Sequence, residues 1–238
     1  MTDQPSAGGP LSPVDLLRML TEAVQQIHAA KSLYAAAGSL AQNAVRHLGA
    51  DAAGVLLYPR SGARQRLAAT DDLLLFLDRR DEGVAASPRA NELAPGELLL
   101  VRDTETDETW PQWSAAVHSR GLRSAMFAGL PPVRGRAVTV ELYARRADGF
   151  ARIGPVMAAQ LATHVGLALQ HADRRANLED ALYSRGIIGQ AQGIIMERYK
   201  LTSEQAMAYL RRSSQESHEP VRSLAADIVR DRDPDPPS

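Results

Sequence analysis

The sequence predicts an α+β fold in two parts, an antiparallel sheet with flanking helices and then a long helix that leads into a small helical bundle. Five short apolar runs separated by turn residues indicate the sheet, and they cover residues 52–58, 65–70, 98–101, 124–130 and 137–143. A helical pattern from residue 153 to about 199 indicates the connection, because it greatly exceeds the average helix of roughly 11 to 12 residues. The chain therefore reads as one medium domain followed by a small one.

Two amphipathic helices are predicted before the sheet. Ser12 is a suitable N-cap with Pro13 at the first helical position, and helically spaced apolar residues follow at Leu16, Leu17, Leu20, Val24 and Ile27. A second helix is predicted over 32–48, where Gly49 ends it. We expect both helices to pack on the sheet.

Composition excludes several classes of function. The 238 residues include no cysteine, which excludes disulfides, zinc–thiolate sites and thiol nucleophiles. The formal net charge is −1, so no global basic field attracts nucleic acid. His164 and His171 lie two turns apart without a His-Glu-x-x-His pattern, so no metal site is expected. Nucleophile-elbow, P-loop and Rossmann patterns are missing, so we expect neither an enzyme nor a cofactor.

The composition of the two ends predicts disorder there, and the hydropathy of the chain predicts its location in the cell. Residues 1–11 are rich in Pro, Gly and Ser, and residues 231–238 alternate Asp with Pro, so both ends are expected to be disordered. The N-terminus lacks a basic segment followed by an apolar one, and no stretch offers the roughly 18 apolar residues of a membrane span. We therefore expect a cytoplasmic protein with no membrane partner.

The long helix carries a partial coiled-coil pattern. Its apolar positions at spacings of four and three are Leu161, Val165, Ala168, Ala172 and Leu182. Arg175 and Glu179 interrupt this seam. The pattern predicts an imperfect coiled coil and a homodimer.

Two further helices are predicted after the long one. The first opens at Thr202 or Ser203, with Gln205 completing a capping box, and the second opens near Pro220. The apolar residues expected to close a three-helix core are Ala206, Leu210, Val221, Leu224, Ala225 and Ile228.

The end of the long helix is unusual because Gly186, Gly189 and Gly193 each cost about 1 kcal/mol relative to Ala in a helix. Helical spacing predicts that one face points to the bundle core, through Ile188, Ala191, Ile195 and Tyr199. An adjacent face carries Arg185, Gly189, Gln192, Gly193 and Met196. Two interpretations remain open: tight packing against a neighbouring helix, or a ligand surface on which Arg185 and Gln192 bind base edges or phosphates.

The end of the long helix and the two helices after it share a longer pattern of motifs. It consists of Ser184-Arg185-x-x-Ile188-x-Gln190-Ala191-x-Gly193-Ile194-Ile195-Met196-Glu197-Arg198, Thr202-Ser203-Glu204-x-Ala206, Leu210-Arg211-x-x-Ser214 and Leu224-Ala225-x-x-Ile228. This pattern resembles the ANTAR family over about 50 residues. The resemblance implies a three-helix module that recognises paired RNA hairpins near intrinsic terminators and lets transcription continue. The implied RNA-binding residues are Arg185, Gln192, Gly193, Met196, Lys200, Arg211, Arg212, Ser214 and Arg222. Gln192 departs from the family, which usually has Lys or Arg there.

The preceding region carries the run 52–58, Asp103, and three motifs, Trp110-Pro111-x-Trp113, Gly121-Leu122-Arg123-Ser124 and Glu141-Leu142-Tyr143 leading to Gly149-Phe150. Together these features resemble a GAF domain. The Gly-Pro-Cys turn of many such domains is replaced by Glu82-Gly83-Val84-Ala85. Two tryptophans beside a proline favour core anchors and a helix entry over the walls of a ligand pocket. The predicted domains are a GAF-like sensor over 12–171 and a linker with the ANTAR bundle over 172–230.

Together these features predict a signal-responsive RNA-binding antiterminator. A small-molecule or protein signal would act on the GAF-like domain, and a dimer would present two bundles to two hairpins. Two alternatives stay open: a DNA-binding regulator, whose last helices resemble a helix-turn-helix, and a protein-interaction adaptor that dimerises through its GAF-like domain. Residues 177–230 are formally neutral, so charge alone favours none of the three.

Overall fold

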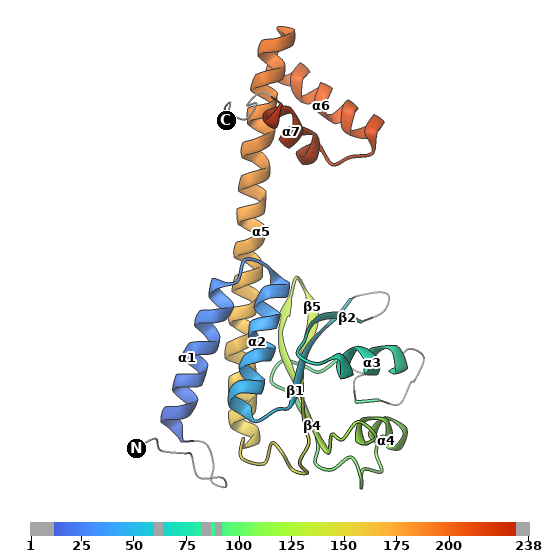
Figure 1. Ribbon diagram of the computed structural model, residues 1–238. Coiled ribbons are helices and arrows are strands. Elements are labelled where there is room, and N and C mark those ends of the chain that lie inside the picture. Colours follow the sequence, from blue (N-terminus) through green and yellow to red (C-terminus); the bar gives the residue numbers. More distant parts are fainter. Residues whose placement is uncertain (1–11, 60–63, 82–86, 89–91, 232–238) are drawn as a thin grey trace, which may run out of the picture. The chain divides into compact units, whose positions relative to one another are not determined.

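The computed structural model describes residues 12–59, 64–81, 87–88 and 92–231 (Figure 1). The chain divides into two compact units, Met1–Arg174 and Arg175–Ser238, called here the first and the second unit. The predicted disordered ends lie outside the described residues except for Asp231, and so does the turn at 82–85. The predicted α+β fold is confirmed, with one five-stranded antiparallel sheet and seven helices among the described residues.

Helices α1 (Pro13–Ala29) and α2 (Leu33–Leu48) form where the sequence predicts them. The Ser12 hydroxyl accepts a hydrogen bond from the Asp15 amide, which caps α1 as expected. Gly49 ends α2 in the left-handed region, with φ of 71°. Both helix boundaries thus follow from local chemistry.

The sheet has the order β2-β1-β5-β4-β3, and every neighbouring pair is antiparallel. Its strands are β1 (Ala52–Tyr58), β2 (Gln65–Ala69), β3 (Leu98–Val101), β4 (Ser124–Val133) and β5 (Arg136–Ala144). Pairing of β1 with β2 confirms the predicted hairpin. The first unit also contains α3 (Asp72–Asp81), α4 (Pro111–His118) and the beginning of α5 (Pro155–Tyr199).

Strand β4 is longer than predicted, because Pro131 and Pro132 do not break it. The register of β4 with β5 shifts between Leu130 and Val133, so the two prolines occupy an irregularity where no regular ladder hydrogen bond is required. The hairpin then turns through Arg134 and Gly135, whose φ values of 53° and 70° fit a two-residue type I′ turn.

Alternate side chains of the sheet build two separate cores. One face packs against α1, α2 and the beginning of α5, as β4 shows with Met126, Ala128 and Leu130. The opposite face packs against α3 and α4, where Phe127 contributes from β4. Trp113 is buried in this second core, which confirms the core-anchor interpretation.

The second unit is a three-helix bundle. Helix α5 (Pro155–Tyr199) has 45 residues and supplies its first helix, followed by α6 (Ser203–Ser217) and α7 (Val221–Arg230). Its core contains five buried residues, Ala191, Ile195, Ala206, Leu210 and Ala225. The predicted capping box at Thr202 and Gln205 is present, with both reciprocal hydrogen bonds.

The predicted coiled-coil seam is divided between the units. Val165, Ala168 and Ala172 are buried in the core of the first unit, which they share with residues of α1, α2 and the sheet. Leu182 belongs to the second unit and is exposed. The first part of the seam thus serves the chain's own packing.

Candidate nucleic-acid interface

The glycine-bearing face of α5 lies opposite the bundle core. A helix turns by about 100° per residue, so Gly193, two residues from both Ala191 and Ile195, points about 200° away from each. Ala191 and Ile195 are buried, whereas Gly189 and Gly193 are exposed. This part of α5 therefore presents its backbone to solvent.

No close neighbour among the described residues explains these glycines. Outside the helix's own backbone, no atom of a described residue lies within 4 Å of the position that a Cβ would take at Gly186, Gly189 or Gly193. Alanine would fit at all three positions and would favour the helix. Tight packing against the described part of the second unit thus does not account for the glycines. The remaining interpretation is a surface for a partner outside the chain.

Gln192 has a structural partner that the sequence did not reveal. Its side-chain amide donates hydrogen bonds to the carbonyl oxygen of Ser203, at 2.7 Å, and to the Ser203 hydroxyl, at 2.8 Å. Ser203 is the first residue of α6. Gln192 is half-buried and ties α5 to the beginning of α6, so its amide nitrogen is already engaged.

A shallow groove runs between Gln192 and α6. Its lining combines Gln192, Arg211 and Arg212 of the predicted set with Ser203, Glu204, Met207, Ala208 and Gln215. Arg212 lies 3.7 Å from Glu216 in a helical ion pair, whereas Arg211 has no ion pair among the described residues. The structure thus brings three predicted residues to one place.

Arg222 lies on a different flank of α5. Its Nη1 atom donates to both carboxylate oxygens of Asp180, at 2.9 and 3.0 Å, and so ties α7 to α5. Asp180 and Gln192 are twelve residues apart, which separates their directions on the helix by about 120°. Arg222 therefore does not join the groove.

Two other predicted residues have local roles. Lys200 takes the left-handed conformation, with φ of 55°, directly after α5. The Leu201 amide then bonds to the Met196 carbonyl at 3.2 Å, which is the hydrogen bond of a Schellman motif. The Ser214 hydroxyl donates to the Glu219 carbonyl in the connection to α7.

Ion pairing distributes the charge of the formally neutral segment 177–230 unevenly. Among the acids, Asp180 pairs with Arg222, Glu216 with Arg212, and Asp227 with Arg230. Within the described part of the second unit, the exposed cations Arg185, Arg198, Lys200 and Arg211 have no ion pair. Three of these four, Arg185, Lys200 and Arg211, belong to the predicted RNA-binding set, and the exposed Glu204 beside the groove is the opposing charge.

One prediction about the core face is wrong. Tyr199 is 52% exposed, because it is the last residue of α5 and extends beyond the small core. Its ring lies beside that of Tyr209, with 5.7 Å between centroids. Tyr209 itself is half-buried against the bundle core, so only the Tyr199 ring of this pair is exposed.

The described residues contain neither a metal site nor a membrane span. Among the described residues, no group of three or more His, Asp or Glu side chains could hold a metal ion. Within the same part of the chain, no helix is both long and apolar enough to span a bilayer. The His164 ring instead contacts the Gln160 carbonyl within α5.

Comparison with known proteins identifies the second unit. The ANTAR domain family model matches residues 176–229, so the chain carries an ANTAR domain there. No curated protein matches the chain by sequence.

Solved structures identify the fold of the first unit as GAF-like. The photosensory core module of the Stigmatella aurantiaca phytochrome has a TM-score of 0.53 at 11% identity, over 94% of this chain and 48% of that one. A bacteriophytochrome from the photosynthetic bacterium R. palustris has a TM-score of 0.54 at 11% identity, over 84% and 48%. The chain spans about half the length of these two structures, and at such identity the likeness concerns the fold alone.

Proposed function

We propose that this chain is a signal-responsive RNA-binding transcription antiterminator, whose ANTAR domain recognises paired RNA hairpins under control of the GAF-like domain. The observation that carries this function is the exposed glycine face of α5, where the Cβ positions of Gly186, Gly189 and Gly193 are empty. A helix surface formed by glycines lets a nucleic-acid backbone approach closely. The domain match supplies the class of partner.

The free cations support RNA as that partner. Arg185 lies on α5, Lys200 follows it and Arg211 lies on α6, and each is exposed without an ion pair among the described residues. Three phosphate contacts give a slope of about −2 for log K against log salt on single-stranded loops. Binding by one module is therefore weak and only modestly salt-dependent.

A homodimer supplies the missing affinity in this proposal. Leu178 and Leu182 lie one turn apart on α5 and are 60% and 58% exposed. A second copy pairing along this stripe would bury both leucines and would present two ANTAR domains to two hairpins. Replacing both leucines by Glu should yield a monomer by light scattering, together with a lower affinity for a two-hairpin RNA.

The direct test is a binding titration with an RNA that carries two hairpins. Arg185→Ala and Arg211→Ala should each weaken binding about tenfold, which is the scale of one lost charged contact. Arg230→Ala is the matched control, because Arg230 pairs with Asp227 and lies outside the predicted set.

The other outcomes discriminate the alternatives. Unchanged affinity in both variants would reject the proposed face. Duplex DNA competing better than hairpin RNA would favour a DNA-binding regulator. Complete failure to bind RNA at low salt would favour a protein-interaction adaptor. The chain has no catalytic role in this scheme.

A further inference from the structure

The turn that joins β4 to β5 is fastened to α5 by two side-chain contacts. The Arg134 guanidinium donates hydrogen bonds to both carboxylate oxygens of Asp173, at 2.9 and 2.7 Å. The Gln170 side-chain amide donates to the carbonyl oxygen of Pro132 at 2.7 Å. Both helix residues belong to the first unit, which ends at Arg174. The β4–β5 hairpin thus holds the last part of α5 that belongs to this unit.

A glycine brings the same hairpin into close contact with the helix. A Cβ at Gly166 would clash with the Pro131 ring, so only glycine allows this approach. Gly166, Gln170 and Asp173 follow one another at spacings of four and three residues, and they therefore lie on one face of α5. The three contacts together form a continuous strip between the hairpin and the helix.

The backbone of the turn shows that the Arg134 side chain is important there. Arg134 has a φ of 53°, a conformation that favours glycine or asparagine in a two-residue hairpin turn and is unfavourable for arginine. Asp173 is 3% exposed, and a buried carboxylate requires a partner. The charged hydrogen bonds between the two side chains offset both costs.

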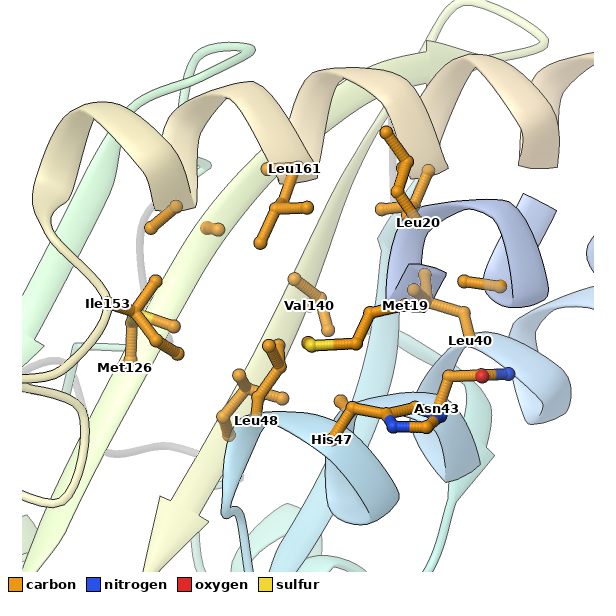
Figure 2. A pocket seen from close by; sticks show the side chains of 17 residues that line it. Met19, Leu20, Leu40, Asn43, His47, Leu48, Met126, Val140, Ile153 and Leu161 are labelled. Atoms are coloured by element: carbon orange, nitrogen blue, oxygen red, sulfur yellow. The ribbon is translucent and has the colours of Figure 1, made fainter. Parts of the chain in front are cut away.

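The turn of α5 before this strip is loosely packed. A cavity of about 70 Å³ lies there between the sheet and helices α1, α2 and α5. Figure 2 shows Leu161 pointing from α5 into this space, and Ala158, Ala162 and Val165 line it from the same helix. Protein cores are normally filled to crystal-like density, so this part of α5 has room to move that a filled core would deny.

We propose that the β4–β5 hairpin is a releasable clamp on α5. While Arg134 holds Asp173, α5 keeps one position against the sheet. When the pair opens, the part of α5 beside the cavity is free to shift. The Arg134 side chain is 54% exposed, so the pair opens towards solvent without unfolding of the unit.

The continuity of α5 gives the clamp its consequence. This helix begins in the first unit and continues into the second. Release of the clamp is therefore a step through which an input to the GAF-like domain changes RNA binding. That consequence rests on the proposed function, whereas the clamp itself does not.

A distance measurement between two spin labels tests the clamp in the full chain. The sequence contains no cysteine, so labels attach only at introduced positions. Ala115→Cys on α4 and His171→Cys on α5 are both at exposed sites, on helices that pack on opposite faces of the sheet. Pulsed electron paramagnetic resonance should give one narrow distance distribution for this labelled chain.

Two variants of the labelled chain should release the clamp. Arg134→Gly combined with Asp173→Asn removes the pair without leaving a buried charge, and glycine suits the turn. Gly166→Ala displaces the hairpin with its added methyl group. Each should widen the distance distribution about twofold or add a second population. Arg134→Lys keeps the positive charge and should keep the distribution narrow.

Each release variant has a matched control. Arg102→Gln removes an exposed ion pair with Asp148, whose atoms lie 3.3 Å apart, and neither residue belongs to α5. Gly154→Ala adds a methyl group where no atom of a described residue lies within 4 Å. Both controls should leave the distribution unchanged. Thermal unfolding of the same samples verifies that every variant is folded.

A distribution that stays narrow in both folded release variants would overturn the clamp. Equal widening in the two controls would overturn it as well, because the pair and the glycine would then have no special role. RNA titration tests the consequence, and release should change the affinity for the two-hairpin RNA about threefold or more. A widened distribution with unchanged affinity would show that the clamp does not act on RNA binding. If the unmodified chain binds no RNA, the proposed function fails, and the distance distributions still decide the clamp.

Discussion

The Gln192 side chain donates two hydrogen bonds to Ser203, one to its carbonyl oxygen and one to its hydroxyl, and thereby joins α5 to the beginning of α6. Gln192→Ala should lower the free energy of unfolding of the second unit by about 1 kcal/mol, because both contacts are lost. Its RNA affinity should fall as well, since α6 carries Arg211 into the groove. Thermal unfolding and RNA titration on the same samples would measure both effects.

Gln192→Lys separates the structural role from an electrostatic one. A lysine ammonium can still donate to the Ser203 carbonyl, so stability should stay near that of the unmodified chain. The added cation should make the slope of log K against log salt steeper by about 0.7 to 0.9. A slope identical to that of the unmodified chain would show that RNA does not approach this position.

The glycine face makes the second prediction. Gly186→Ala, Gly189→Ala and Gly193→Ala should each stabilise the helix by about 1 kcal/mol, because the added methyl groups meet open space. The triple variant should nevertheless bind the two-hairpin RNA at least tenfold more weakly, since its methyl groups keep the nucleic-acid backbone at a distance. Chemical denaturation and RNA titration test this combination. A more stable variant with undiminished affinity would show that the face does not contact RNA.

Local signals in the sequence were sufficient for most of the fold. Ser12, Gly49 and the Thr202 capping box mark helix boundaries through contacts within a few residues, and the apolar spacing identifies the bundle core. Pro131-Pro132 misled the prediction, because a register shift lets prolines sit inside β4. That shift depends on pairing with β5, which a single strand does not reveal.

The candidate site was less predictable than the fold. Helical spacing placed Gly193 and Gln192 on one surface, but it could not show that Ser203 occupies the Gln192 amide or that Asp180 holds Arg222. In both pairs the partner lies on a different helix, at a distance that helical spacing does not reveal. Tyr199 fitted the core spacing and is exposed, because the bundle core ends before the helix does.

The ion pair between Arg222 and Asp180 makes the third prediction. Both side chains are more than half exposed, so the ion pair should contribute no more than about 1 kcal/mol to the free energy of unfolding. Arg222→Asp removes the pair and also places two acids opposite each other, and both changes should lower the stability. The swapped variant, Arg222→Asp with Asp180→Arg, should restore the stability. Its RNA affinity should lie within twofold of the unmodified chain, because the pair lies away from the groove. A stable swapped chain with strongly weakened binding would instead return Arg222 to the RNA face.

Lys200 makes the fourth prediction. A left-handed conformation costs a residue with a Cβ about 1 kcal/mol or more, and glycine avoids this cost. Lys200→Gly should therefore raise the free energy of unfolding by about 1 kcal/mol, measured by denaturant titration. The same variant should flatten the salt dependence of RNA binding by about 0.7 to 0.9 in slope, as expected for one lost phosphate contact. Lys200→Asn, which also tolerates this conformation, is the control for the loss of charge alone.

Asp103 and Arg123 make the last prediction, in the first unit. Arg123 donates to both carboxylate oxygens of Asp103, at 3.2 and 2.6 Å, and this hydrogen bonding lowers the pKa of Asp103 below its ordinary value. Because the folded pKa lies below the unfolded one of about 3.9, the stabilising effect is complete above that pH and is lost as the pH falls through the folded value. Carboxyl ¹³C titration should show Asp103 ionising below pH 4, and Arg123→Gln should move its pKa upward. High salt should reduce the difference, since the Arg123 side chain is 40% exposed. An Asp103 pKa that Arg123→Gln leaves unchanged would show that the pair does not persist in solution.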